Sequence, residues 1–158
     1  MPAIKGARFN GNANQGPPVK LSAKDAPSRR GLYLLHVSIH GRFRSVSPEI
    51  GVDADTGGQT KYVLELLRRL GKVRDVHRVE LLTRKIKDPR LSADYAKNVE
   101  VVAERSRIVR LPCGPEGYLP KERLWPHLQE FIDNALRYVR DQGEVPDAIH
   151  GHYADGGF

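Results

Sequence analysis

The chain contains 158 residues, of which 28% are charged and 39% are hydrophobic, and its formal net charge is +7. This composition is typical of a folded globular protein and excludes a fully disordered one. The longest apolar run, Leu32 to Ile39, is far shorter than the roughly 20 residues of a membrane-spanning helix, so no membrane partner is predicted. Because no early apolar segment resembles a signal peptide, we expect a cytoplasmic location.

Residues 1–30 are rich in Gly, Asn, Pro and Lys and show no hydrophobic periodicity. They hold six lysines and arginines against one aspartate, so most of the positive charge lies here. We interpret this stretch as a flexible basic tail. The chain has no basic stripe interleaved with aromatic residues and no zinc-finger spacing, which argues against nucleic acid as a partner.

A buried strand is predicted from Leu32 to Ile39, because this short apolar run is rich in Leu, Val, Ile and Tyr and is too short for most helices. A helix is predicted from Gly58 to Leu70, because apolar residues recur at helical spacing between Val63 and Leu70. Gly71 is the expected C-terminal cap of this helix. The chain therefore passes from a strand to a helix through a polar loop.

That loop contains the stretch Asp53-Ala54-Asp55-Thr56-Gly57-Gly58-Gln59-Thr60-Lys61. Its paired glycines leave the backbone N–H groups and the positive dipole of the helix start accessible to a phosphate. Alternatively, Asp55 or Thr56 is an ordinary N-cap and the glycines serve only the turn. The spacing alone leaves both interpretations open.

The second half of the chain continues the alternation of strands and helices. Strands are predicted at residues 78–83, 98–103, 107–111 and 147–150, with 98–103 at an edge of the sheet. A helix is predicted from near Trp125 to Gly143. Its inner face comprises Leu124, Leu128, Phe131, Ala135 and Val139. This order predicts an α/β, Rossmann-like fold with a largely parallel sheet.

Three single residues carry side chains that can bind a phosphate or act as a nucleophile. Arg42 and Arg44 are interpreted as surface arginines rather than phosphate ligands. Cys113 is predicted to be an inert, partly buried thiol, because nothing adjacent would lower its pKa and a single cysteine permits no internal disulfide.

The end of the chain, His150-Gly151-His152-Tyr153-Ala154-Asp155, contains two histidines and an aspartate. A His-x-His pair without a third nearby histidine or cysteine is a poor indication of a metal site. We therefore expect no metal and no cofactor. This stretch again ends a strand and leads into paired glycines, as the first loop does.

Three stretches are specific when they are taken together. They are His40-Gly41 with Asp55-Thr56-Gly57-Gly58-Gln59-Thr60-Lys61-Tyr62-Val63; Arg107-Ile108-Val109-Arg110-Leu111-Pro112-Cys113-Gly114-Pro115 with Leu119-Pro120-Lys121-Glu122-Arg123-Leu124-Trp125-Pro126; and His150-Gly151-His152-Tyr153-Ala154-Asp155-Gly156-Gly157. In this order and spacing, from Leu32 to Phe158, they resemble the N-terminal domain of the sucrose-phosphate synthases and their close relatives among the retaining family-4 glycosyltransferases.

The resemblance implies a GT-B fold, in which two Rossmann-like domains close over a cleft. Residues 31–158 would be the first part of the N-terminal, acceptor-side domain. In this family that domain binds fructose 6-phosphate, and the C-terminal domain binds the donor UDP-glucose, whose glucose is transferred with retention. The substrate-binding residues implied by motif position are Gly57, Gly58 and Gln59 at the donor phosphate and acceptor sugar, Lys121 at the acceptor phosphate and Tyr153 beside that phosphate.

No catalytic residue of the family is matched within this sequence, and Val52 and the segment 42–45 depart from the family pattern. Because the nucleotide-sugar domain does not lie within these residues, we expect the chain to be inactive alone. We also expect it to self-associate through an uncovered sheet edge. Alternatives are a relative of sucrose synthase or mannosylfructose-phosphate synthase, and a non-catalytic binding or interaction module.

Overall fold

The computed structural model describes residues 31–49, 51 and 56–157. The expected basic tail and the acidic part of the first loop, Asp53 to Asp55, lie outside these described residues. The centre of the fold is a five-stranded sheet with the strand order β3-β4-β2-β1-β5. The strands are β1 (Leu32–Val37), β2 (Val76–Arg84), β3 (Val99–Ala103), β4 (Ser106–Leu111) and β5 (Ala148–Gly151).

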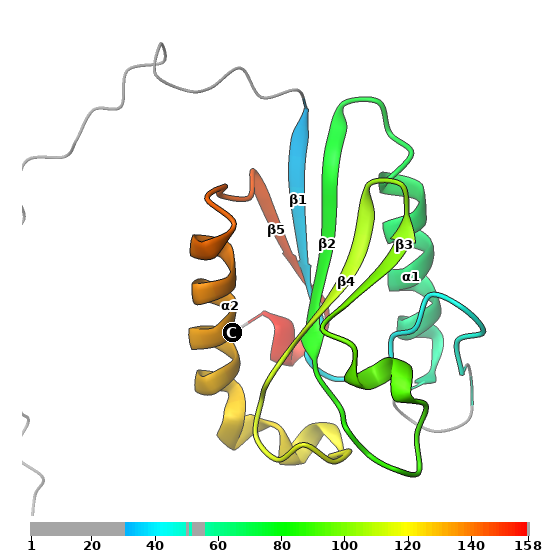
Figure 1. Cartoon of the computed structure of the whole chain (residues 1–158), viewed down its shortest axis with the longest axis vertical. Helices are drawn as coiled ribbons and strands as arrows, with labels where there is room; N and C mark the ends of the chain where they lie inside the picture. The colour runs from blue at the N-terminus through cyan, green and yellow to red at the C-terminus, as the bar shows by residue number, and fades with distance from the viewer. Residues whose placement is uncertain (1–30, 50, 52–55, 158) are drawn as a thin grey trace, which may run out of the picture.

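The pairs β1–β2, β1–β5 and β2–β4 are parallel, and only the edge strand β3 runs antiparallel to its neighbour β4. Two helices cover the sheet, α1 (Gly58–Leu70) on one face and α2 (Leu128–Asp141) on the other (Figure 1). Short 3-10 helices lie in the connections, namely η2 (Ala93–Ala96), η3 (Lys121–Arg123), η4 (Trp125–His127) and η5 (Ala154–Gly156). The predicted α/β class and largely parallel sheet are confirmed.

The two faces of the sheet carry separate hydrophobic clusters, because successive strand residues point to opposite faces. Leu81 and Ile108 pack in the cluster that also contains the α1 residues Val63, Leu64 and Leu67. The next residue on each strand, Leu82 and Val109, packs in the cluster with Leu124 and Phe131. The predicted inner face of the second helix is confirmed, since Leu128, Ala135 and Val139 pack against that cluster.

The helix ends follow the sequence signals with one shift. Gly71 caps α1, as predicted. The second helix becomes α-helical only at Leu128, because Trp125 to His127, with Pro126, form the 3-10 turn η4. Gly143 follows α2 with φ of +66°, a left-handed conformation that favours glycine. Among the described residues, no helix is both long enough and apolar enough to cross a membrane.

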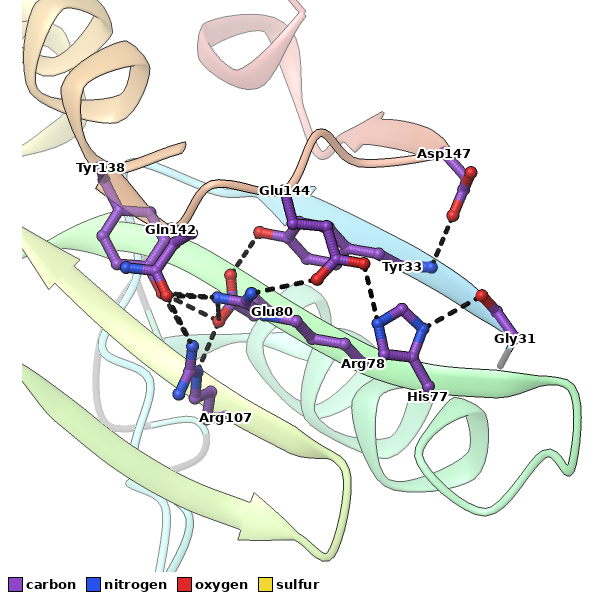
Figure 2. A network of polar contacts seen from close by, with 10 residues as sticks. All are labelled: Gly31, Tyr33, His77, Arg78, Glu80, Arg107, Tyr138, Gln142, Glu144 and Asp147. Carbon is purple, nitrogen blue, oxygen red and sulfur yellow. Dashed lines mark hydrogen bonds and ion pairs between the residues drawn. The ribbon is translucent and has the colours of Figure 1, made fainter. Parts of the chain in front are cut away.

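A polar network joins α2 and the segment after it to the first halves of the strands (Figure 2). Its centre is Glu80 of β2, which has no solvent exposure. One carboxylate oxygen accepts hydrogen bonds from Arg78 at 2.7 Å, Arg107 at 2.5 Å and Tyr138 at 2.8 Å, and the other accepts one from Tyr33. Burial raises the pKa of Glu80, but these bonds outweigh it and the pKa lies below its usual value. This network fixes α2 on the sheet.

Candidate functional site

The candidate site lies at the carboxyl ends of the parallel strands, at the lower end of the sheet in Figure 1. The loop after β1, the start of α1, the segment after β4 and the turn after β5 all lie there (Figure 1). Open parallel sheets place their ligands at this edge, because loops from several strands meet there. The sequence-predicted residues Gly57, Gly58, Gln59, Lys121 and Tyr153 all come from these loops.

The start of α1 bears on the two interpretations of the paired glycines. Gly57 is the N-cap residue, with φ of −75°, and no side-chain hydrogen bond from the described residues caps the helix there. Thr56 is therefore not the N-cap, and Asp55 lies outside the described residues. A Cβ atom on Gly58 would meet nothing within 4 Å, and its φ lies outside the left-handed region. Neither glycine is required by its backbone angle, so the turn alone does not explain the pair.

A chain of polar side chains runs from α1 to the turn after β5. The Gln59 side-chain amide donates to Ser38 Oγ at 3.0 Å, and Ser38 Oγ donates to the backbone oxygen of His40 at 3.3 Å. The Asp155 carboxylate lies 2.8 and 2.9 Å from Nδ1 of His40 and also accepts the His40 backbone N–H at 3.3 Å. Because a carboxylate only accepts, Nδ1 of His40 carries the proton and the ring orientation is fixed.

Lys121 and Tyr153 meet at the same edge. Lys121 Nζ donates to Tyr153 Oη at 3.0 Å and lies 4.9 Å from the centre of the tyrosine ring. The Tyr153 ring lies edge-on to His40, with centroids 4.7 Å apart, and 55% of the residue is exposed. Its φ is +64°, a conformation that costs a non-glycine residue about 1–3 kcal/mol. The structure thus holds an exposed phenol beside a lysine, on a residue whose backbone is strained.

The glycines of the last stretch serve a different purpose from Gly58. A Cβ atom on Gly151 would lie 2.0 Å from the backbone oxygen of Gly156. Likewise, a Cβ atom on Gly156 would lie 2.7 Å from the backbone oxygen of Val37. These close approaches bring η5 back against β1 and β5, and they carry Asp155 to His40.

Arg84, at the end of β2, organises the segment that carries Lys121. It is 3% exposed, and its guanidinium donates to the backbone oxygens of Cys113 at 2.8 Å, of Gly117 at 2.7 Å and of Pro115. Burial lowers the pKa of Arg84 from its ordinary value. Cys113 itself is buried, and burial raises the pKa of its thiol to about 11, which confirms that it is inert at neutral pH.

The interpretation of Arg42 and Arg44 as surface arginines is wrong. Arg42 is 5% exposed, and its Nη1 lies 3.2 Å from Oε2 of Glu49. Arg44 is partly buried, with Nη1 3.6 Å from Asp94 and its guanidinium over the Tyr95 ring. Both arginines fold the loop after β1 onto the body of the domain, because a buried charge needs a partner of opposite sign.

Three histidines gather on the α1 face of the sheet. They are His36 of β1 and His150 and His152 of β5 or just after it, and their ligand nitrogens all lie within 4.8 Å of one another. Burial, and the neighbouring histidines, lower the pKa of His36 to about 4; burial and His150 lower the pKa of His152 to about 4. Asp155 binds His40 instead, so His150, His152 and Asp155 do not form one cluster as a sequence reading would place them.

Sequence reasoning did not single out Ser38 or His36, and it did not identify Asp155 as the partner of His40. It placed Arg84 at this edge but interpreted it as part of a solvated basic loop, whereas the residue is buried. The structure brings Lys121 and Tyr153 into direct contact and links Gln59 to them through Ser38 and His40. The only available signal was position, because Ser38 and Arg84 stand at the carboxyl ends of predicted parallel strands.

No family model matches the chain. Among curated proteins, the chain is 42% identical over 160 residues to sucrose-phosphate synthase 4 of Arabidopsis thaliana, which covers 88% of this chain. It is 37% identical over 182 residues to probable sucrose-phosphate synthase 1 of Craterostigma plantagineum, covering 94% of this chain. The chain spans 15% and 17% of the lengths of these two relatives.

Among solved structures, the chain is similar to the sucrose-phosphate synthase of Thermosynechococcus elongatus. The TM-score is 0.64 and the sequence identity 28%, and the match covers 80% of this chain and 28% of that one. The sequence similarity and the structural similarity therefore both extend over most of the chain.

Proposed function

Since this chain is homologous over most of its length to one segment of the sucrose-phosphate synthases, a group of glycosyltransferases, we propose that the edge described above is an acceptor half-site for fructose 6-phosphate. The parent reaction would transfer glucose from UDP-glucose to this acceptor with retention. Residues 31–158 would belong to the N-terminal, acceptor-side domain of a GT-B enzyme. The nucleotide-sugar donor would be bound by a second domain, so this segment alone would not catalyse transfer.

The contact between Lys121 and Tyr153 carries the proposal. An ammonium group and a phenol hydroxyl 3.0 Å apart, both partly exposed, give a dianionic phosphate one charged donor and one neutral donor. Glu122 lies 3.9 Å from Lys121 Nζ and is mainly solvent-exposed, so a phosphate competes with a weak surface partner. The site thus suits a phosphorylated acceptor better than a neutral sugar.

The start of α1 would face the other end of the cleft. In the proposed roles, Gly57 and Gly58 allow a phosphate oxygen of the donor to approach the first N–H groups of the helix. Gln59 is oriented by Ser38, which leaves the amide at a fixed position for a sugar hydroxyl. The first turn of α1 contains no acidic residue that would repel an anion.

The proposal is tested by isothermal titration of the chain with fructose 6-phosphate, with fructose as the comparison ligand. Lys121→Ala removes the ammonium group, and Lys72→Ala, an exposed lysine just beyond α1, is the matched control. We expect binding that requires the phosphate, that weakens in Lys121→Ala by about 10- to 100-fold, and that is unchanged in Lys72→Ala. Equal affinity for both sugars, or no effect of Lys121→Ala, would overturn the acceptor half-site.

A further inference from the structure

The histidine cluster arises from the register of the sheet. His36 of β1 is paired directly with His150 of the parallel strand β5. Directly paired residues of neighbouring strands share a face. His152 lies one residue beyond the end of β5, and its ring stacks on that of His36, so it joins the other two on this face. The three imidazoles therefore lie together on the α1 face, outside the polar chain that links His40 to Asp155.

The contacts within the cluster leave ligand capacity unused. His36 Nδ1 lies 3.0 Å from His152 Nε2, so one of these two nitrogens holds a proton between the rings. The other nitrogen of His36, Nε2, is buried and has no hydrogen-bond partner, although only 3% of the residue is exposed. A buried nitrogen without a partner costs about 1–3 kcal/mol, which a bound ligand can offset.

The cluster is also accessible. His36 and His150 line an open cavity of about 270 Å³ between α1 and the neighbouring strands, with Tyr62, Leu66 and Leu70 on the helix side. His150 is exposed, so an ion can reach the site without opening the core. The ring of His152 lies 4.2 Å from that of His150, between centroids, and 5.2 Å from that of His36.

We propose that His36, His150 and His152 form a binding site for a divalent late transition metal, with Zn²⁺ as the reference ion. Three imidazole nitrogens with no carboxylate in the group match the preferences of Zn²⁺, Ni²⁺ and Cu²⁺, and not those of Mg²⁺ or Ca²⁺, which take oxygen ligands. Three protein ligands leave a fourth tetrahedral position for water. Among the residues that the structure describes, this is the one group of three or more such side chains that converges in this way.

A bound ion would connect the edge strand β5 to β1. All four residues of β5 are exposed, and in the described part of the chain β1 is its one strand neighbour. An ion that binds only the folded chain stabilises it in proportion to the logarithm of its concentration above Kd. Because Tyr153 follows His152 directly, the ion would also fix the position of Tyr153, whose hydroxyl is the proposed hydrogen-bond donor to the phosphate. The metal site does not depend on the proposed function.

The experiment is isothermal titration of the full chain, without a histidine affinity tag, with ZnCl₂. The variants are His36→Gln, His150→Gln and His152→Gln, and His127→Gln, a histidine outside the cluster, is the matched control. Loss of an outer-shell partner of a metal costs about 10- to 100-fold in affinity, so loss of a ligand should cost at least about 100-fold. We expect one Zn²⁺ per chain, a rise in Tm with Zn²⁺, and loss of both effects in the three cluster variants but not in His127→Gln.

The exposed position of His150 keeps the test decisive, because His150→Gln removes a ligand without leaving a buried group unpaired. Titration with CoCl₂ adds a visible absorption spectrum, in which intense bands mark a tetrahedral site with nitrogen ligands. Absence of Zn²⁺ binding in the wild-type chain would overturn the metal site. Zn²⁺ binding in His150→Gln and His36→Gln with the same affinity as in the wild-type chain would do so as well, because it would assign the ion to histidines elsewhere.

Discussion

Lys121 of η3 and Tyr153 beyond β5 are joined by a hydrogen bond of 3.0 Å from Nζ to Oη, and the ammonium group also lies over the tyrosine ring. Two residues that are far apart in the sequence thus present two hydrogen-bond donors to one point in space. Because the phenol oxygen accepts a hydrogen bond from the lysine ammonium, the phenol O–H can donate to a phosphate oxygen.

This pairing predicts coupled effects on fructose 6-phosphate binding. Tyr153→Phe removes one neutral donor and should weaken binding by about 0.5–1.5 kcal/mol, less than Lys121→Ala does. The double variant should lose less than the sum of the two losses, by about 0.5 kcal/mol or more, because the side chains contact each other. Titration calorimetry on the four proteins measures this. Strictly additive losses would mean that the two groups do not act on the same phosphate.

The glycines of the two loops predict opposite outcomes. Gly58→Ala should leave the fold intact or stabilise it by about 0.5–1 kcal/mol, because the Cβ atom meets open space and alanine favours helix. It should nevertheless weaken binding of UDP-glucose in a protein that carries both halves of the cleft. Gly151→Ala should instead destabilise the chain, since its Cβ atom would lie 2.0 Å from the Gly156 backbone oxygen.

Urea unfolding separates the two variants, with Gly58→Ala serving as the control for Gly151→Ala. A loss of stability in Gly58→Ala would indicate that the paired glycines are needed for the fold and not for a ligand. A stable Gly151→Ala chain would mean that η5 can move away from β5 without cost.

The sequence predicted the order of the elements well, because each depends on local periodicity and capping. The helix from Gly58 to Leu70 was predicted within its observed bounds, and the inner face of the second helix was correct. The second helix begins later than predicted because Pro126 is accommodated in a 3-10 turn. These features can be predicted because they depend only on residues that are close together in the sequence.

The remaining features depend on tertiary contacts, which local sequence patterns do not specify. The meeting of His36 and His150 follows from the pairing of β5 with β1, which a strand order read along the chain does not reveal. The burial of Arg42 depends on Glu49, since a polar loop in sequence is compatible with either a buried pair or two solvated charges. Substrate roles for Lys121 and Tyr153 came from the resemblance, and they stay predictions.

Arg84 predicts a positioning effect on Lys121. Arg84→Met keeps a similar apolar stem but leaves the backbone oxygens of Cys113, Pro115 and Gly117 without their donor. We expect a loss of roughly 3 kcal/mol in the free energy of unfolding, because the Cys113 oxygen is buried, the other two bonds are partly buried, and an acceptor left without its charged donor is costly. Under conditions where the variant is still folded, its affinity for fructose 6-phosphate should also fall.

Arg69→Met is the matched control for Arg84→Met. Arg69 is an exposed residue of α1, so its loss should change the free energy of unfolding by no more than about 0.5 kcal/mol. Equal effects of the two substitutions in urea unfolding would show that Arg84 does not organise the loop.

The self-association predicted from the sequence is testable at the edge strand. Ile149 of β5 is 67% exposed and lines an apolar groove of about 370 Å³ between α2 and the sheet. We expect the sedimentation coefficient of the chain to rise with concentration and Ile149→Glu to reduce this rise, because a charge on an exposed edge disfavours strand pairing. Val46→Glu, at an exposed residue of the loop after β1, is the control. A wild-type chain that stays monomeric at all concentrations would contradict the prediction.

Glu80 predicts the stability of the chain in acid. Its pKa is lower in the folded chain than the ordinary value of 4.5, although burial acts in the opposite direction. A depressed carboxyl pKa contributes stability that is fully present above that ordinary value and is lost as the pH falls through the pKa of the folded state. The wild-type chain should therefore lose stability steadily below about pH 5.

Glu80→Gln should lower the free energy of unfolding near neutral pH by on the order of 3 kcal/mol, because Arg78 and Arg107 then lack their buried counter-charge. It should also show a smaller further loss between about pH 5 and pH 3, since one titrating group has been removed. Urea unfolding at a series of pH values measures both effects. The control is Glu65→Gln, whose carboxylate is half-exposed on α1 and pairs with Arg68, and it should follow the wild-type pH profile. If Glu80→Gln and the wild-type chain lose stability in parallel below pH 5, another carboxylate governs the acid transition, and the network in Figure 2 contributes only at neutral pH.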